Sequence, residues 1–301
     1  MVVIFILLIG GFFGSEFLYK GDLKPLTSPL ADVGKNVGLN QWFPQQVLGV
    51  QTGAPEINAK SAFFIETNFG QVLYEKKSHD KLPIASLVKI MTALLAVEHK
   101  SLDDNFTVSQ TAADMEPDKM ELIAGEKLTL RELLYGIFLI SANDAAEVLA
   151  EDLTGRRAEF IQLMNSKALQ LGMKDSYFAN PTGLDEDGNN SYSSAYELVL
   201  LCRYAIRHYP FLVDFSKTEH IILPQTKDHQ DYDMYSGINL LTTYPGVVGF
   251  KTGFTPEAGL TLVTLARKGS HEVLGVILGS GDRRDEAREL LDYSFKKLGV
   301  Q

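Results

Sequence analysis

The sequence predicts a mixed α/β (α+β) fold in which both ends of the domain contribute strands to one antiparallel sheet, with a helical subdomain inserted between them. Strand-like segments lie near the start of the domain, at 61–67 and 71–75, and near its end, at 247–251, 260–266 and 272–278. The stretch between the two groups carries helical periodicity and helix-capping residues. Because strands from both ends need partners, one sheet completed by the two ends is the arrangement we expect.

Length and composition limit the functions open to the chain. Its 301 residues, 45% hydrophobic and 22% charged, are those of an ordinary globular protein. A net charge of −10, without a cluster of Lys and Arg, argues against nucleic-acid binding. Cys202 is the only cysteine, so no intrachain disulfide can form, and its apolar helical surroundings predict a buried thiol. The six histidines lack metal-binding spacing, and we expect no metal.

Residues 1–16 form an apolar segment that predicts export. Residues 2–13 contain no acid or base. These twelve residues would reach about 18 Å as a helix, short of the roughly 30 Å hydrocarbon core of a bilayer, which favours a signal-peptide core over a complete span. No Lys or Arg precedes the run and no small-x-small cleavage site follows it, so a cleaved signal and the tail of an uncleaved anchor both stay open. The alternative is a buried N-terminal helix or strand.

Residues 17–54 predict a linker that leads into a folded domain at 55–301. The stretch 18–52 is rich in Pro, Gly, Lys and Asn and shows little periodicity. The domain then opens with a hairpin, because Asn68-Phe-Gly70 joins its first two strand-like segments.

Helices account for the middle and the end of the domain. A strongly apolar helix is expected over 86–97. Capping boxes at 129–132 and 194–197 predict two further helix starts. Another helix, 158–171, is followed by a glycine, which is typical of a helix end, and 284–298 is the last predicted helix.

Three short motifs occur in one order along the chain and together predict a serine acyl-transfer site that uses lysine as its base: Ser86-Leu-Val-Lys89, Ser141-Ala-Asn143 and Lys251-Thr-Gly253. Each is weak alone: Ser-x-x-Lys also occurs at 78–81 and at 294–297, whereas Ser-x-Asn and Lys-Thr-Gly each occur once. Their order and their expected local structures carry the prediction.

Ser86 and Lys89 are the candidate nucleophile and base. Ser86 stands at the expected start of a helix, where a backbone N–H points outward, and Lys89 follows one turn later on the same face. A lysine acts as a base only when neutral, which requires burial or a neighbouring cation such as Lys251. The alternative is that Ser86 caps the helix and Lys89 is solvated.

Ser141 and Asn143 lie at a predicted break between two helices, which would project their side chains into a cleft. We expect Ser141 to pass a proton from Lys89 to the departing amine, and Asn143 to donate to a substrate carbonyl. The alternative is that Asn143 or Asp144 only caps the following helix.

The third motif falls on a predicted strand. Lys251 and Thr252 offer a cation and a hydroxyl suited to a substrate carboxylate. Gly253 lets a ligand lie against the backbone. The N–H of Phe254 would join that of Ser86 as an oxyanion hole. An ordinary strand end before a turn is the alternative.

At this point the chain resembles the serine D-alanyl-D-alanine carboxypeptidases among the penicillin-binding proteins. The resemblance runs from about residue 55 to residue 298 and extends beyond the motifs to 82–94, 141–146, 164–165, 171–173, Phe178, 180–184, 246–255 and 290–293. It implies the β-lactamase/transpeptidase-like fold of the penicilloyl-serine transferases. It also implies export, action on peptidoglycan stem peptides at the outer face of the cytoplasmic membrane or in the cell-wall space, acylation by β-lactams, and no cofactor.

The resemblance also bears on the two ends of the chain. Many relatives carry a further β-rich domain and a C-terminal membrane helix, whereas this sequence stops soon after its last predicted helix; membrane attachment is therefore expected only through the N-terminal segment. Arg283 stands where relatives often hold an arginine near the substrate carboxylate, although it would also fit a solvated charge at a helix start.

Three alternatives to a D-Ala-releasing carboxypeptidase stay open. A D,D-endopeptidase would use the same residues. A β-lactamase needs a carboxylate that activates the deacylating water, and residues 185–187 look like a solvated turn. A non-hydrolytic peptidoglycan-binding module would be expected to lack Ser86 or Lys89, and both are present.

Overall fold

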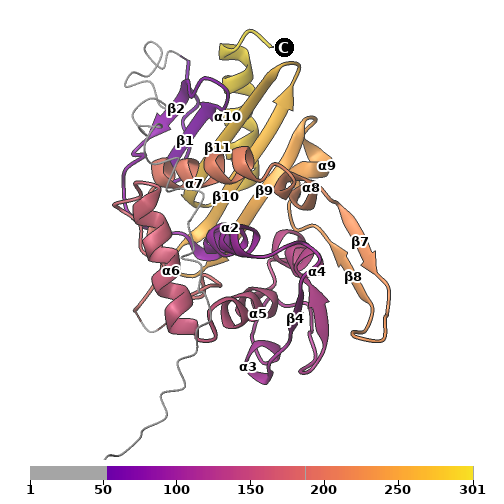
Figure 1. Ribbon diagram of the computed structural model, residues 1–301. Helices are drawn as coiled ribbons and strands as arrows, with labels where there is room; N and C mark the ends of the chain where they lie inside the picture. The colour runs from indigo at the N-terminus through magenta and orange to yellow at the C-terminus, as the bar shows by residue number, and fades with distance from the viewer. Residues whose placement is uncertain (1–52, 187, 301) are drawn as a thin grey trace, which may run out of the picture. The chain divides into compact units, whose positions relative to one another are not determined.

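A five-stranded antiparallel sheet organises the domain in the computed structural model, which describes residues 53–186 and 188–300. Its strand order is β2-β1-β11-β10-β9, so the first hairpin pairs directly with the last part of the chain, Phe63 opposite Val276. The predicted sheet from both ends is therefore confirmed (Figure 1). The apolar N-terminal segment and nearly all of the predicted linker lie outside the described residues. The sheet strands are β1 Ser61–Glu66, β2 Val72–Lys76, β9 Val247–Thr255, β10 Gly259–Lys268 and β11 His271–Ser280.

Helices cover both faces of this sheet. The Phe63 ring contacts Tyr196 of α7 (Ala195–His208) on one face, with 5.5 Å between ring centroids. Phe64 belongs instead to the apolar cluster that includes Leu290 of α10 (Arg283–Lys297). Side chains alternate along a strand, and this explains why every residue of β1 is buried. Figure 1 shows α7 and α10 on opposite sides of the sheet.

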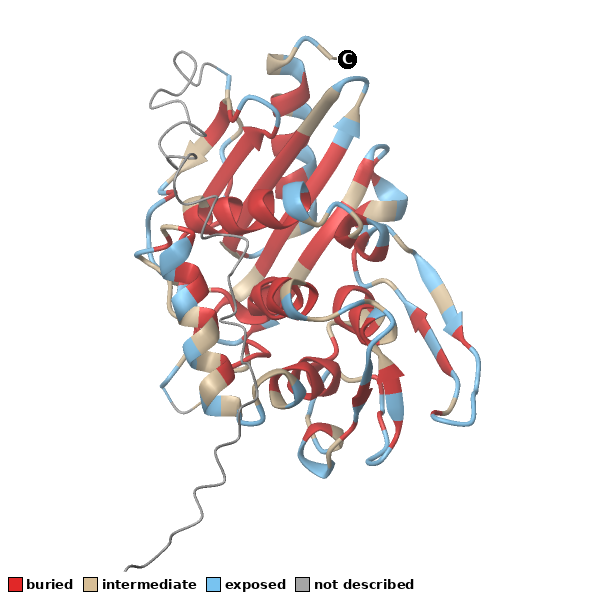
Figure 2. Ribbon diagram, in the orientation of Figure 1, coloured by how far each residue is buried: buried red, intermediate tan, exposed pale blue. Residues whose placement is uncertain are grey.

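The rest of the described chain forms the helical region and three two-stranded ribbons. Figure 2 shows α2 deeply buried, whereas exposed residues alternate with buried or intermediate ones along the β7–β8 ribbon. The helices are α2 Lys89–His99, α3 Gln110–Ala113, α4 Leu130–Tyr135, α5 Asn143–Thr154, α6 Arg157–Gln170, α8 Leu212–Ser216 and α9 Leu240–Thr243. The ribbons pair β3 Leu82–Pro83 with β6 Tyr192–Ser193, β4 Asn105–Thr107 with β5 Lys127–Thr129, and β7 His220–Leu223 with β8 Tyr232–Tyr235.

Both predicted capping residues begin a helix, but only one of the two capping boxes is complete. Thr129 and Glu132 form a complete capping box. Ser194 accepts from the Glu197 N–H, but the Glu197 carboxylate accepts from the Asp175 N–H, so the second half of that box is not made. Glu197 thus ties α7 to the segment before it.

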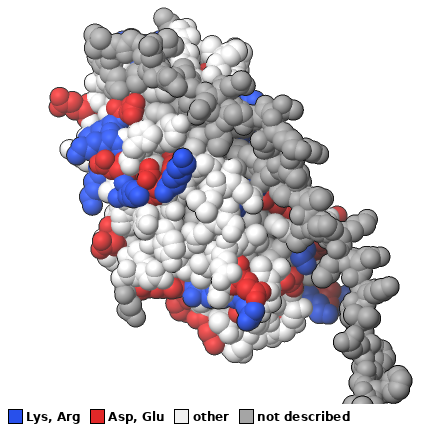
Figure 3. All heavy atoms as spheres, turned by 60° about the vertical axis from the view of Figure 1, so that its left-hand side comes forward, with Lys and Arg blue, Asp and Glu red and all other residues white. Residues whose placement is uncertain are grey.

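Charged side chains of both signs share the surface. On the face in Figure 3, Lys and Arg side chains lie among Asp and Glu side chains. Across the residues that the structure describes, no helix has the length and apolar character needed to cross a bilayer.

Candidate active site

Ser86 and Lys89 meet at the junction of two helical segments. Ser86 lies in a 3₁₀ turn, Ala85–Val88, which leads directly into α2, and Lys89 is the first residue of α2. Ala85 adopts a φ of 48°, a left-handed conformation that is uncommon for a residue with a side chain. The Lys89 Nζ donates to the Ser86 Oγ at 3.0 Å, and both side chains are buried.

The Lys89 amine contacts three oxygens. Besides Ser86 Oγ, it donates to Asn143 Oδ1 and to the Thr182 carbonyl, both at 2.7 Å. A neutral amine has two hydrogens and one lone pair. Once the amine is neutral, with its two hydrogens directed to Asn143 and Thr182, its lone pair takes the place of the N–H that the charged form donates to Ser86 Oγ, which is the orientation a base requires.

Electrostatics favour the neutral form of this amine. Burial lowers the pKa of Lys89 well below its ordinary value, and the positive charge of Lys251 lowers it further. Asp118 and Asp144 act in the opposite direction on the same pKa. Burial and the neighbouring Arg283 also lower the pKa of Lys251, to about 7, so two lysines lie in one site with reduced proton affinity.

Ser141 contacts Lys251. The Lys251 Nζ donates to Ser141 Oγ at 2.8 Å and to the Thr252 carbonyl at 2.7 Å. Ser141 follows a π-helical turn, Gly136–Ile140, and has a φ of 63°. The predicted break between two helices is therefore present, and it points the hydroxyl at the lysine of the third motif.

Asn143 and Asp144 begin α5, and neither is its N-cap, which is Ala142. The Asn143 side-chain amide donates to the Glu116 carbonyl at 3.3 Å while its oxygen accepts from Lys89. The buried Asp144 carboxylate accepts from three backbone N–H groups, two of them in the segment between α3 and β5. Asn143 thus holds Lys89, a contact that the sequence did not predict.

Strand β9 passes close to Ser86. A Cβ on Gly253 would lie 2.9 Å from the Ser86 nitrogen and 2.6 Å from Thr261 Oγ1, so only glycine fits there. The next side chain, Phe254, is 61% exposed. Gly253 therefore allows the close approach that an oxyanion hole between two backbone amides would need.

Arg283 lies behind the third motif. Its Nη1 donates to the carbonyls of Gly253, at 2.5 Å, and Thr261, at 3.2 Å. Arg283 and Thr252 line one cavity of about 40 Å³ with residues 237–240. This fixed cation beside Thr252 is more than a solvated helix-start charge.

The two other Ser-x-x-Lys matches have different surroundings. Ser78 donates to Glu75 at 2.5 Å, and Lys81 pairs with Asp175 at the surface. Ser294 donates to a carbonyl one turn back in α10.

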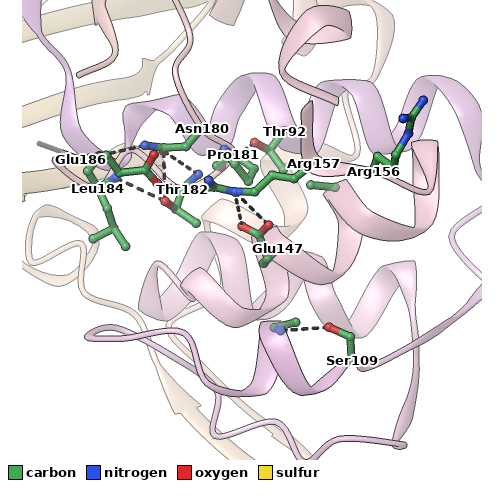
Figure 4. Close-up of polar contacts among 12 residues, drawn as sticks. Thr92, Ser109, Glu147, Arg156, Arg157, Asn180, Pro181, Thr182, Leu184 and Glu186 are labelled. Carbon is green, nitrogen blue, oxygen red and sulfur yellow. Dashed lines mark hydrogen bonds and ion pairs between the residues drawn. The ribbon is translucent and has the colours of Figure 1, made fainter. Parts of the chain in front are cut away.

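A loop at 179–186 supplies the Thr182 carbonyl (Figure 4). Asn180 Oδ1 accepts from the N–H groups of Thr182 and Gly183, and Thr92 of α2 donates to the Pro181 carbonyl at 2.7 Å. Only the resemblance at 180–184 pointed to this segment, because a backbone acceptor leaves no mark on residue type.

In the predicted solvated turn at 185–187, Glu186 is 34% exposed and also has a partner that the sequence did not predict. Its carboxylate accepts from Arg157 Nη2 at 2.5 Å. In the described residues, no group of three or more His, Cys, Asp or Glu side chains is arranged to hold a metal.

Comparison with known proteins agrees with this geometry. Residues 49–282 match the family described as D-alanyl-D-alanine carboxypeptidase. The chain is 36% identical to D-alanyl-D-alanine carboxypeptidase DacF of Bacillus subtilis over 83% of this chain, and spans 65% of that protein's length. It is 31% identical to the D-alanyl-D-alanine carboxypeptidase of Streptomyces sp. (strain K15), over 80% of this chain and 88% of that protein.

Solved structures confirm the expected fold. The D-alanyl-D-alanine carboxypeptidase of Mycobacterium tuberculosis superposes with a TM-score of 0.75 at 28% identity, over 84% of this chain and 96% of that one. The Streptomyces K15 DD-transpeptidase gives 0.75 at 29% identity, over 81% and 99%.

Proposed function

Because this chain belongs to the D-alanyl-D-alanine carboxypeptidase family, we propose that it is a serine D-alanyl-D-alanine carboxypeptidase, removing the terminal D-Ala from peptidoglycan stem peptides through a Ser86 acyl-enzyme. The observation that carries the proposal is the buried Lys89 amine, held by Asn143 and Thr182 at 3.0 Å from Ser86 Oγ, where its neutral form directs the lone pair at that hydroxyl. Without such a base the Ser86 hydroxyl is a weak nucleophile.

Acylation then transfers the acyl group of the substrate to Ser86 and a proton to the departing amine. Lys89 takes the Ser86 proton while Ser86 Oγ forms a bond to the penultimate D-Ala carbonyl carbon. The negative oxygen rests between the Ser86 and Phe254 amides, and losing one such donor typically costs about 10²–10³ in rate. The C–N bond breaks, and the proton reaches the departing D-Ala amine through Ser141, which Lys251 holds at 2.8 Å. Water then hydrolyses the ester.

Lys251, Thr252 and Arg283 support docking of the terminal carboxylate. A buried anion needs charged or hydrogen-bonding partners, and these three side chains provide two cations and a hydroxyl. The lowered pKa of Lys251 belongs to the site without substrate, because a bound carboxylate raises it again. Asn143 keeps a second amide hydrogen for the substrate carbonyl.

A β-lactam should acylate the same serine, and the resulting acyl-enzyme should be hydrolysed slowly. The leaving group of a β-lactam stays attached to the adduct, where it hinders attack by water on the ester. Glu186, a carboxylate near the site, is engaged by Arg157, which does not favour the β-lactamase alternative.

We further propose that the protein is exported, with any membrane attachment through residues 1–16, and that it acts at the outer face of the cytoplasmic membrane or in the cell-wall space.

The test is D-Ala release from a D-Ala-D-Ala-terminated stem peptide by the purified protein. We expect release by the parent and none by Ser86→Ala, and little turnover of a crosslinked peptide. Failure of the parent to release D-Ala, with cleavage of the crosslink instead, would favour the endopeptidase alternative. Inactivity on both would contradict the proposal.

A further inference from the structure

The loop at 179–186 touches both halves of the candidate catalytic pair. Its Thr182 carbonyl takes one hydrogen of the Lys89 amine at 2.7 Å. Gly183, with a φ of 84°, packs so closely on the Ala85 carbonyl that a Cβ there would overlap it. Because Ala85 precedes Ser86, a shift of this loop displaces the nucleophile's backbone as well as the base.

A residue of α5 also accepts a hydrogen bond from the Lys89 amine. The other acceptor of the Lys89 amine is Asn143, the first residue of that helix. Orientation of the lone pair towards Ser86 therefore depends on the distance between the loop and α5. Any contact that joins these two elements fixes that distance.

Arg157 makes such a contact (Figure 4). At the start of α6, it donates through Nη2 to Glu186 of the loop at 2.5 Å, and its Nε lies 3.1 Å from Oε1 of Glu147. Glu147 is on α5, one turn after Asn143. One guanidinium thus spans the loop and the helix that supply the two acceptors.

The burial of Glu147 strengthens this bridge. Its side chain is 1% exposed, and burial raises its pKa while Arg157 lowers it. A buried carboxylate needs a counter-charge, which holds the Arg157 guanidinium in place on the α5 side. The half-exposed Glu186 is then drawn to an anchored cation.

We propose that Arg157 is a positioning residue for the Ser86–Lys89 pair, joining the loop at 179–186 to α5 through Glu186 and Glu147. This rests on the proposed function. The neighbouring arginine offers a matched control, because Arg156, the N-cap of α6, pairs with Glu159 in the first turn of that helix and points away from the loop in Figure 4. Arg156–Glu159 and Arg157–Glu186 are both arginine–glutamate ion pairs, and only the second reaches the loop.

The experiment measures acylation by a fluorescent penicillin in the full chain, separating the dissociation constant of the non-covalent complex from the acylation rate constant. Arg157→Gln and Glu186→Gln should each lower the rate constant about tenfold, because a 1 Å misplacement of reacting groups costs about 10²-fold and loss of this tie should displace them by less than that. The dissociation constant should stay unchanged, since the carboxylate-docking side chains are untouched. Arg156→Gln and Glu159→Gln should behave as the parent.

Two further readouts separate positioning from folding. The fraction of protein labelled at long times should equal that of the parent, and Glu186→Gln keeps the buried Glu147–Arg157 pair intact if Arg157→Gln folds poorly. The double variant Arg157→Gln/Glu186→Gln should be no slower than either single variant, because both break one tie.

The outcomes distinguish the two proposals. Absence of labelling in the parent would remove the proposed function itself. Normal labelling of the parent with parental rate constants in Arg157→Gln and Glu186→Gln would overturn the positioning role alone. Additive losses in the double variant, or equal losses in the Arg156 and Glu159 controls, would also overturn it.

Discussion

The sheet core and the seam between the sheet and α2 are both buried, yet they bury opposite kinds of side chain. Phe64 and Ile277 in the sheet are fully buried among apolar groups. In the seam, Lys89 of α2 and Lys251 of β9 are at most 1% exposed, and both are ionisable. Apolar burial stabilises the fold, whereas burial of an ionisable group opposes it.

This difference indicates that the sheet core mainly stabilises the fold and that the seam mainly carries the catalytic groups. The seam holds groups whose proton affinity is altered by burial, which is the property that a catalytic lysine needs. The sheet holds β9, and hence Gly253, in a fixed place beside Ser86. Substitutions in the two regions should therefore separate into losses of rate and losses of stability.

The largest expected effect is at Lys89. Lys89→Arg should lower penicillin acylation by about 10²–10⁴, the usual contribution of a general base, because a guanidinium stays protonated. Lys251→Arg should retain more activity, since docking a carboxylate requires only a cation. Rates of labelling measure both, with Lys81→Arg at the surface as the control. Equal tolerance at Lys89 and Lys251 would remove the distinction between base and docking cation.

The next effect concerns the sheet. Phe64→Ala should lower the free energy of unfolding by about 3–5 kcal/mol through lost burial and a cavity. The folded fraction should acylate at the parental rate. Denaturant unfolding measures the loss, and Phe69→Ala, at a side chain 83% exposed, should leave stability unchanged. A Phe64 variant of full stability but slow acylation would break the comparison between the two regions.

A smaller effect is the contribution of the buried Lys89 to the pH dependence of the free energy of unfolding. The unfolded chain keeps the Lys89 proton up to its ordinary pKa of 10.5, whereas the folded state releases it at lower pH. The unfolded state therefore binds more protons, and stability rises with pH until pH 10.5 is approached. Lys89→Met should remove up to about 1.4 kcal/mol per pH unit from this slope, measured by denaturant unfolding between about pH 7 and pH 10. An unchanged slope would mean that Lys89 is charged in the folded protein.

The smallest effect is a proton taken up on binding. Lys251, with a pKa of about 7 in the free protein, should regain its proton when a carboxylate ligand binds. Calorimetry of Ser86→Ala with a D-Ala-D-Ala peptide, in buffers of different ionisation enthalpy, should show uptake at about pH 8 and weaker binding as pH rises. The C-terminally amidated peptide is the control. Uptake that is the same for both peptides would exclude Lys251 as the docking cation.

The sequence predicted the parts that depend on residue type and spacing. Alternating and apolar runs located the sheet strands, and Ser86 with Lys89 followed from their one-turn spacing. It did not predict the Thr182 carbonyl or the contact between Asn143 and Lys89, because both depend on how distant segments pack. The Arg157 partner of Glu186 was not predicted for the same reason, since it lies 29 residues away in sequence.

The central claim is that Ser86 is the nucleophile, and the most direct measurement is the site of penicillin attachment. Intact-mass analysis and peptide mapping of the treated protein should find one persistent adduct, on the peptide that contains Ser86. The folded Ser86→Ala variant should carry none. An adduct on Ser78 or Ser294, or one that survives in Ser86→Ala, would contradict the account.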